Sequence, residues 1–203
     1  MITDANYFYL SDLLGTLFFA ISGTLSAKRK DIDIFGAAFL GFVTAIGGGS
    51  MRDVFLNLRP VWVNDSNYLI AIFLGILIAI IFNRQLYGYY RTLTLFDAIG
   101  ISFFTILGVQ NSLNYESNVY AAIIFGMFTA VCGGMTRDIL LNETPLIFKK
   151  EVYATACLAG GLTYILLVHL AFDLSWAAFI AAGVVFLIRM TAVKYRLYLP
   201  RLD

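Results

Sequence analysis

The sequence predicts an all-α integral membrane protein with seven transmembrane helices, and three observations lead to this fold class. First, 60% of its 203 residues are hydrophobic and only 13% are charged, with a mean hydropathy of +0.81. Soluble domains carry roughly 25% charged residues, and a small domain cannot bury this much apolar surface. Second, the chain divides into long apolar segments. Third, its first half repeats in its second half.

Seven apolar segments have the length that a membrane-spanning helix needs, which is about 20 residues. They cover residues 8–27, 34–52, 67–83, 95–112, 119–138, 151–170 and 174–192. The connections between them are short, and none has the composition of a domain linker. We therefore expect residues 1–203 to form one transmembrane domain.

With the exception of Arg59, the basic residues of the connections lie in alternate ones, which predicts the orientation of the chain. They are Lys28, Arg29 and Lys30, then Arg84 and Arg91, then Lys149 and Lys150, and finally Lys194, Arg196 and Arg201. With seven spans, all of these positions fall on one side of the membrane. Because cytoplasmic loops carry the excess of Lys and Arg, we expect the N-terminus outside the cell and the C-terminus in the cytoplasm.

Two stretches align at an offset of 85 residues: "TAIGGGSMRDVFLNLRP", Thr44–Pro60, and "TAVCGGMTRDILLNETP", Thr129–Pro145. The alignment extends in both directions without a gap, and pairs Asp12 with Asp97 and Tyr68 with Tyr153. The sequence thus predicts one repeat at about 8–83, a second at about 93–170, and a single helix at 174–192. Since each repeat holds three spans, the second must be inverted relative to the first. Inverted repeats commonly place a substrate or ion path at their interface.

The glycines of the repeated block predict kinks in the second and fifth helices. Gly47, Gly48 and Gly49 lie in one helix, and Gly133 and Gly134 lie in the other. Adjacent glycines weaken a helix, and the carbonyls freed by a kink suit a partly dehydrated cation. Four hydroxyls are candidates to extend such a lining: Thr44, Ser50, Thr129 and Thr136. The alternative is close helix packing, which small residues favour in membranes.

Charged residues recur one turn after each set of glycines, as Arg52-Asp53 and Arg137-Asp138. A charge deep in the bilayer is costly, so it is expected to be paired. With inverted repeats, Asp12 lies at the same membrane surface as Arg52, and Asp97 at the same surface as Arg137. We expect these two pairs to form, either as structural salt bridges or as part of a gate.

Other functions find less support in the sequence. Lys149, Lys150 and Glu151 open the sixth segment, where anionic headgroups attract the lysines, although simple anchoring on the cytoplasmic side also explains them. The sequence holds no nucleophile motif, phosphate-binding loop or metal-ligand cluster, and its basic residues are dispersed. We therefore expect neither an enzyme nor a nucleic-acid-binding protein, and neither a cofactor nor a structural metal.

The "GGGSMRD" block, its copy "CGGMTRD" and the stretch "KKEVYA" on this helix plan resemble the prokaryotic branch of the trimeric intracellular cation channel (TRIC) family. The same group is also described as UPF0126, or as a glycine transporter domain. The resemblance implies a homotrimer in the plasma membrane, with one pore in each protomer formed at the kinked helices. It also implies potassium, or sodium, as the permeant cation, and a lipid contact at Lys150 and Glu151 as in eukaryotic relatives.

The residues alone reach an inverted-repeat channel or transporter, and two functions stay open. One is a passive channel for monovalent cations. The other is a secondary transporter of a small zwitterion such as glycine, whose carboxylate and amine could bind at half-helix ends.

Overall fold

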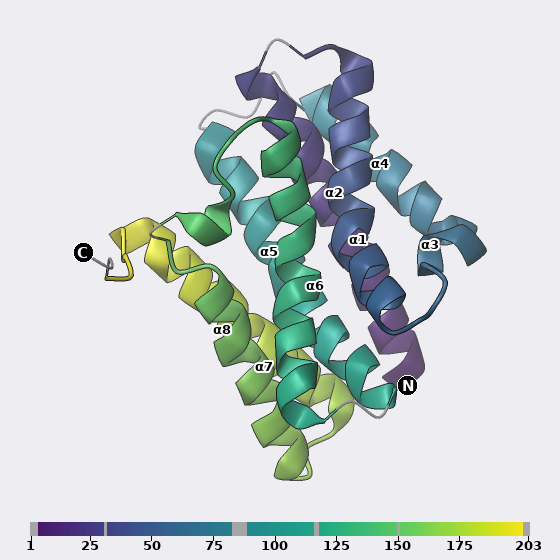
Figure 1. Cartoon of the computed structure of the whole chain (residues 1–203), viewed down its shortest axis with the longest axis vertical. Coiled ribbons are helices and arrows are strands. Elements are labelled where there is room, and N and C mark those ends of the chain that lie inside the picture. The colour runs from purple at the N-terminus through teal and green to yellow at the C-terminus, as the bar shows by residue number, and fades with distance from the viewer. Residues whose placement is uncertain (1–3, 31, 83–88, 116–117, 150, 201–203) are drawn as a thin grey trace.

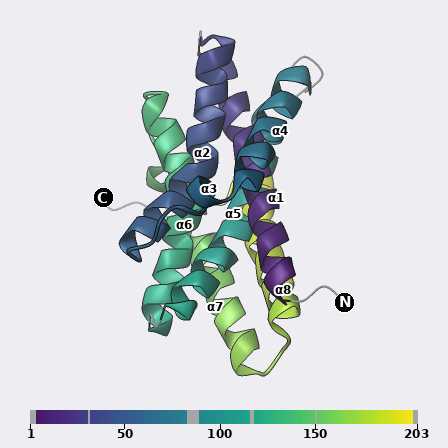
Figure 2. The same cartoon turned by 90° about the vertical axis from the view of Figure 1, so that its right-hand side faces the viewer.

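The protein is a bundle of α-helices, seen from two sides in Figures 1 and 2. A computed structural model describes residues 4–30, 32–82, 89–115, 118–149 and 151–200. Its α-helices are α1 (Asp4–Ser26), α2 (Ile34–Phe55), α3 (Val61–Asn64), α4 (Ser66–Phe82), α5 (Tyr89–Asn114), α6 (Val119–Leu140), α7 (Ala154–His169) and α8 (Leu174–Tyr195). Short 3-10 helices, η1 (Ala27–Arg29) and η2 (Leu146–Phe148), lie between them.

Each of the seven predicted segments corresponds to one long helix, and α3 is a short addition after α2. By length and composition, five helices in the described part of the chain can cross a membrane: α1, α2, α5, α6 and α8. Helices α4 and α7 are apolar but shorter, with 17 and 16 residues. The chain is therefore a multi-pass helical membrane protein, and a count of seven complete spans stays a prediction.

The helices α2 and α6 begin and end in the same way. Asp33 accepts a hydrogen bond from the backbone N–H of Gly36 at 2.7 Å, and Asn118 accepts one from Ala121 at 2.8 Å. These side chains satisfy N–H groups that the first helical turn leaves free. Just after the helices end, Asn57 and Asn142 adopt positive φ angles of 57° and 54°, a conformation that asparagine tolerates better than most residues.

The bundle interior lies where the two halves of the chain meet. Helix α1 packs against α2, α4 and α5, while α6 packs against α2, α5 and α7. The rings of Phe19 and Phe104 stack there with centroids 5.0 Å apart. Helix α8 packs along α7 and α5 (Figure 1).

The outward faces of the bundle are apolar, as a lipid environment requires. On α4, exposed apolar side chains recur along the helix: Leu69, Ile70, Phe73, Leu74, Leu77 and Ile81. In contrast, most polar residues of α1 are buried, among them Asp12, Thr16, Ser22 and Ser26. A contiguous exposed apolar surface marks a site of membrane or protein contact.

Candidate functional site

The glycines of α2 and α6 bring these two helices into backbone contact at the centre of the bundle. A methyl group on Gly48 would overlap the carbonyl oxygen of Thr129, and one on Gly133 would overlap that of Thr44. The two contacts are reciprocal, because Gly48 aligns with Gly133 and Thr44 with Thr129 in the repeat. Only glycine permits this approach, so these two residues serve close packing here.

Both helices stay α-helical through their glycines, from Ile34 to Phe55 and from Val119 to Leu140. The kinks expected at Gly47–Gly49 and at Gly133 and Gly134 therefore remain predictions. At this contact, a methyl on Gly47 would lie 3.3 Å from the Cα atom of Gly133. The space between the helices is thus filled by backbone.

The four hydroxyls predicted to line a path all have partners in this structure. Thr44 donates to the carbonyl oxygen of Leu40 at 2.6 Å, Thr129 to that of Phe125 at 2.7 Å, and Thr136 to that of Cys132 at 2.8 Å. These are bonds to the preceding turn, which threonine commonly makes in helices. The fourth, Ser50, accepts a hydrogen bond from the indole N–H of Trp62 at 3.0 Å.

The Arg-Asp pairs make the same local contacts in both halves of the chain. Arg52 Nε donates to Asp53 Oδ1 at 2.8 Å, and the other oxygen of Asp53 accepts from the backbone N–H of Val61 at 3.1 Å. Residues 85 positions later repeat this arrangement. Arg137 Nε donates to Asp138 Oδ1 at 2.9 Å, and the backbone N–H of Leu146 donates to Asp138 Oδ2 at 3.1 Å. Each aspartate therefore ties its arginine to the turn after the helix.

The second pair belongs to a buried cluster that we call the Asp97 cluster, formed by Asp97, Arg137, Asp138 and Tyr153. Arg137 Nη1 lies 3.0 Å from Asp97 Oδ1, which is the pairing that the sequence predicts. The same nitrogen donates to Ser22 Oγ at 3.0 Å. Arg137 on α6 thus joins α5 and α1, and it is only 2% exposed.

The equivalent Asp12 cluster, formed by Asp12, Arg52, Asp53 and Tyr68, is paired differently. Tyr68 donates its hydroxyl to Asp12 Oδ2 at 3.0 Å. Asp12 and Arg52 line the same small cavity, but among the described residues no ion pair within 4.0 Å joins them. Arg52 Nη1 is buried there with no hydrogen-bond partner in the described part of the chain. The predicted direct pair is thus found in one cluster and not in the other.

Three contributors to the clusters were not predicted as site residues: the two tyrosines and Ser22. The two tyrosines could have been predicted, because Tyr68 aligns with Tyr153 in the repeat. The neighbouring residue Arg189 was also missed. Its position could have identified it, because it is a lone arginine inside the apolar α8 and charges inside membrane segments are usually functional.

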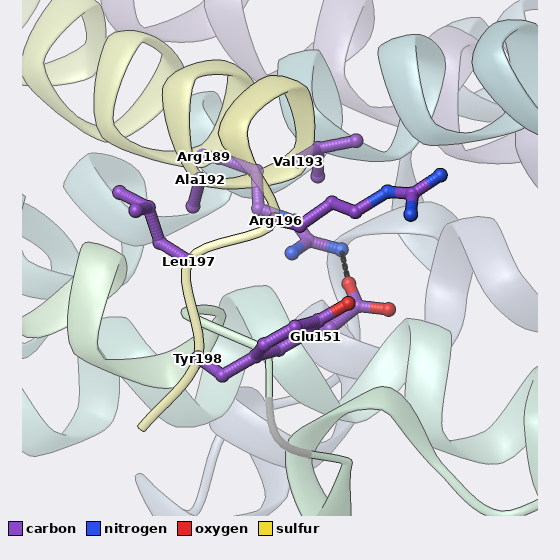
Figure 3. A pocket seen from close by; sticks show the side chains of 7 residues that line it. All are labelled: Glu151, Arg189, Ala192, Val193, Arg196, Leu197 and Tyr198. Carbon is purple, nitrogen blue, oxygen red and sulfur yellow. Dashed lines mark ion pairs between the residues drawn. The ribbon is translucent and has the colours of Figure 1, made fainter. Parts of the chain in front are cut away.

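Glu151 of the Lys-Glu motif lies beside α8. Glu151 forms an ion pair with Arg189 at 2.7 Å, and together they line a cavity of about 130 Å³ with Arg196 and Tyr198 (Figure 3). Lys149 is exposed, and Lys150 falls outside the described residues. No group of three or more metal-ligating side chains occurs in the parts of the chain that the structure describes.

Sequence comparison relates both halves of the chain to one family. The model of the family described as Glycine transporter matches residues 9–84 and 94–169, two blocks that begin 85 residues apart. A UPF0126 membrane protein of Vibrio cholerae is 38% identical over 97% of this chain and 83% of its own length. The UPF0126 inner membrane protein YadS of Escherichia coli is 37% identical over 95% of this chain and 94% of its own.

Solved structures with the same fold are described as cation channels. The TRIC orthologue from Rhodobacter sphaeroides superposes with a TM-score of 0.88 at 33% identity, over 94% of this chain and 98% of that one. A prokaryotic TRIC channel crystallised in 0.5 M KCl gives 0.85 at 30% identity, over 95% and 98%. A TRIC channel from C. elegans shares the fold, with a TM-score of 0.60 at 12% identity over 96% of this chain and 92% of that one.

Proposed function

The chain belongs to the UPF0126 family of membrane proteins, and from this premise we propose that it is a passive cation channel. The observation that carries the proposal is its likeness to prokaryotic TRIC channels at 30–33% identity over nearly the whole of both chains. The buried charge clusters add support, because ionisable groups inside a membrane usually mark an ion path.

The proposal includes the architecture implied by the repeat. The chain crosses the plasma membrane seven times as two inverted three-helix repeats and a last helix, with its N-terminus outside. Three copies assemble as a homotrimer, and each holds its own pore. The recurrence of the Asp53 and Asp138 contacts at an offset of 85 residues supports the repeat, and the trimeric relatives support the assembly.

We place the conduction path along the buried polar faces of α1 and α5, between the Asp12 and Asp97 clusters. When ionised, each cluster holds two carboxylates for one arginine and carries one net negative charge. A negative charge at each end of the path attracts cations and repels anions. Neither cluster forms a ring of acids, so we expect the path to discriminate little among monovalent cations. Potassium is then the main permeant ion, and sodium passes as well.

In this proposal the present structure is closed. Backbone contact between Gly48 and Thr129 fills the centre, so α2 and α6 must separate, or kink at their glycines, for ions to pass. Arg137 holds α1, α5 and α6 together at one end. Releasing Arg137 from Asp97 would free these three helices, which makes the Asp97 cluster a gate.

Flux from liposomes tests the function. Liposomes loaded with potassium and containing purified protein should release it down its gradient when a protonophore lets protons enter to balance the charge, and protein-free liposomes treated in the same way should not. Glycine transport is the second candidate, which the description of the matching family favours. Uptake of labelled glycine that saturates with concentration, together with potassium release no faster than in empty liposomes, would replace the channel by a transporter.

A further inference from the structure

The Asp12 and Asp97 clusters contain the same residue types in two different arrangements. In the Asp12 cluster, the tyrosine is bonded to the aspartate and the arginine does not reach it. In the Asp97 cluster, the arginine is bonded to the aspartate, and the hydroxyl of Tyr153 has no hydrogen-bond partner among the described residues. The carboxylate is thus bonded to the tyrosine in one cluster and to the arginine in the other.

The hydroxyl of Tyr153, the carboxylate of Asp97 and the guanidinium of Arg137 all lie beside Gly134. A methyl built on Gly134 would be 3.0 Å from the Tyr153 hydroxyl, 3.5 Å from Asp97 Oδ1 and 3.6 Å from Arg137 Nη2. The other oxygen of Asp97 is buried and also lacks a partner among the described residues. A movement of the Tyr153 hydroxyl onto Asp97 would give the arrangement seen at Tyr68 and Asp12.

Arg189 lies against the Asp97 cluster, and among the described residues no second arginine lies in the same way against the Asp12 cluster. Arg189 comes from α8, which lies outside the repeat, and only 1% of it is exposed. Its guanidinium lies over the ring of Tyr153, 5.0 Å from the centroid, and Nη1 donates to the carbonyl oxygen of Val152 at 3.3 Å. The ion pair with Glu151 fixes the guanidinium in place (Figure 3).

We propose that Arg189 is a positioning residue that holds Tyr153 away from Asp97 and so keeps Arg137 bound to Asp97. A cation over a buried ring restrains the ring, and the bond to Val152 restrains the backbone beside it. Without Arg189, the Tyr153 hydroxyl donates a hydrogen bond to Asp97, draws charge from the carboxylate and weakens its ion pair with Arg137. Helix α8 therefore makes the two ends of a symmetric path unequal, and it biases the end with the Asp97 cluster toward the closed state. This inference rests on the proposed channel function.

The test compares Arg189→Gln in two backgrounds. In the otherwise unchanged protein, R189Q should raise potassium flux on the order of tenfold, as expected from losing a buried cation–π contact. In the Y153F background the same change should have little effect, because phenylalanine cannot donate to Asp97. R189K, which keeps the cation, should stay near the unchanged protein. Equal increases in both backgrounds would overturn the inference.

Two further readouts keep the inference separate from the channel proposal and from simple misfolding. An experimental structure of R189Q should place the Tyr153 hydroxyl within hydrogen-bond distance of Asp97, whether or not the protein conducts. An unchanged Tyr153 position would contradict the inference even if the flux assay succeeds. If R189Q does not fold, E151Q removes the charge that anchors Arg189, and it should raise flux by a smaller factor that Y153F again suppresses. If E151Q raises flux equally with and without Y153F, the result would count against the mechanism.

Discussion

Replacing Gly48 by alanine should destabilise the protein, although alanine is the better helix former. The added methyl would overlap the carbonyl oxygen of Thr129 on α6, and a backbone atom cannot rotate away as a side chain can. Overpacking costs about 1–3 kcal/mol, and a rigid backbone contact places this site at the upper end. The helix gains about 1 kcal/mol when alanine replaces glycine. The net loss is therefore about 2 kcal/mol.

The neighbouring Gly49 supplies a matched control on the same helix. A methyl there has its nearest neighbour, Arg52 Nη2, at 3.9 Å, which is ordinary contact. Thermal unfolding of the purified protein should show the melting temperature of G48A reduced by about 4–8 °C. That of G49A should be equal to or above the original value. Equal melting temperatures for the two variants would refute the claim that Gly48 serves close packing.

Two other pairs of substitutions separate the clusters by the same thermal measurement. D97N should lower the free energy of unfolding by about 3 kcal/mol, because Arg137 loses a buried ionic partner. D12N should lower it by less than about 1 kcal/mol, because the amide oxygen still accepts a hydrogen bond from Tyr68. The reverse order would contradict the pairing described above. Y68F should cost about 1.5–3 kcal/mol, the value for a hydrogen bond to a charged group. Y153F should leave the free energy of unfolding almost unchanged. A loss equal to that of Y68F would show that the Tyr153 hydroxyl is hydrogen-bonded.

The sequence was sufficient to predict the helices, because their apolar runs have the length of a membrane span. The predicted bounds were least accurate at the start of α5, predicted at residue 95 and observed at Tyr89, and α7 was predicted to start at residue 151 but starts at Ala154. Glu151 instead pairs with Tyr198 in an isolated β-bridge and with Arg189 through its side chain. These partners come from the end of the chain, and local periodicity contains no information about them.

The candidate site was predictable where the repeat carried the signal. The alignment placed Asp97 and Arg137 at one surface, and their ion pair is present. It could not tell that Tyr68 rather than Arg52 reaches Asp12, because that choice depends on side-chain geometry within a few ångströms. Arg189 has no counterpart in the first half of the chain, so comparing the two halves could not reveal its place over Tyr153.

Single-channel recording in a planar bilayer tests the central claim, passive cation conduction, most directly. Purified protein is added between solutions that differ tenfold in potassium chloride. The account predicts discrete current steps that reverse within a few millivolts of the potassium equilibrium potential, which is about 59 mV in size for a tenfold gradient. Current steps that reverse near the chloride potential, of opposite sign, would contradict it, as would the absence of steps from protein that takes up glycine.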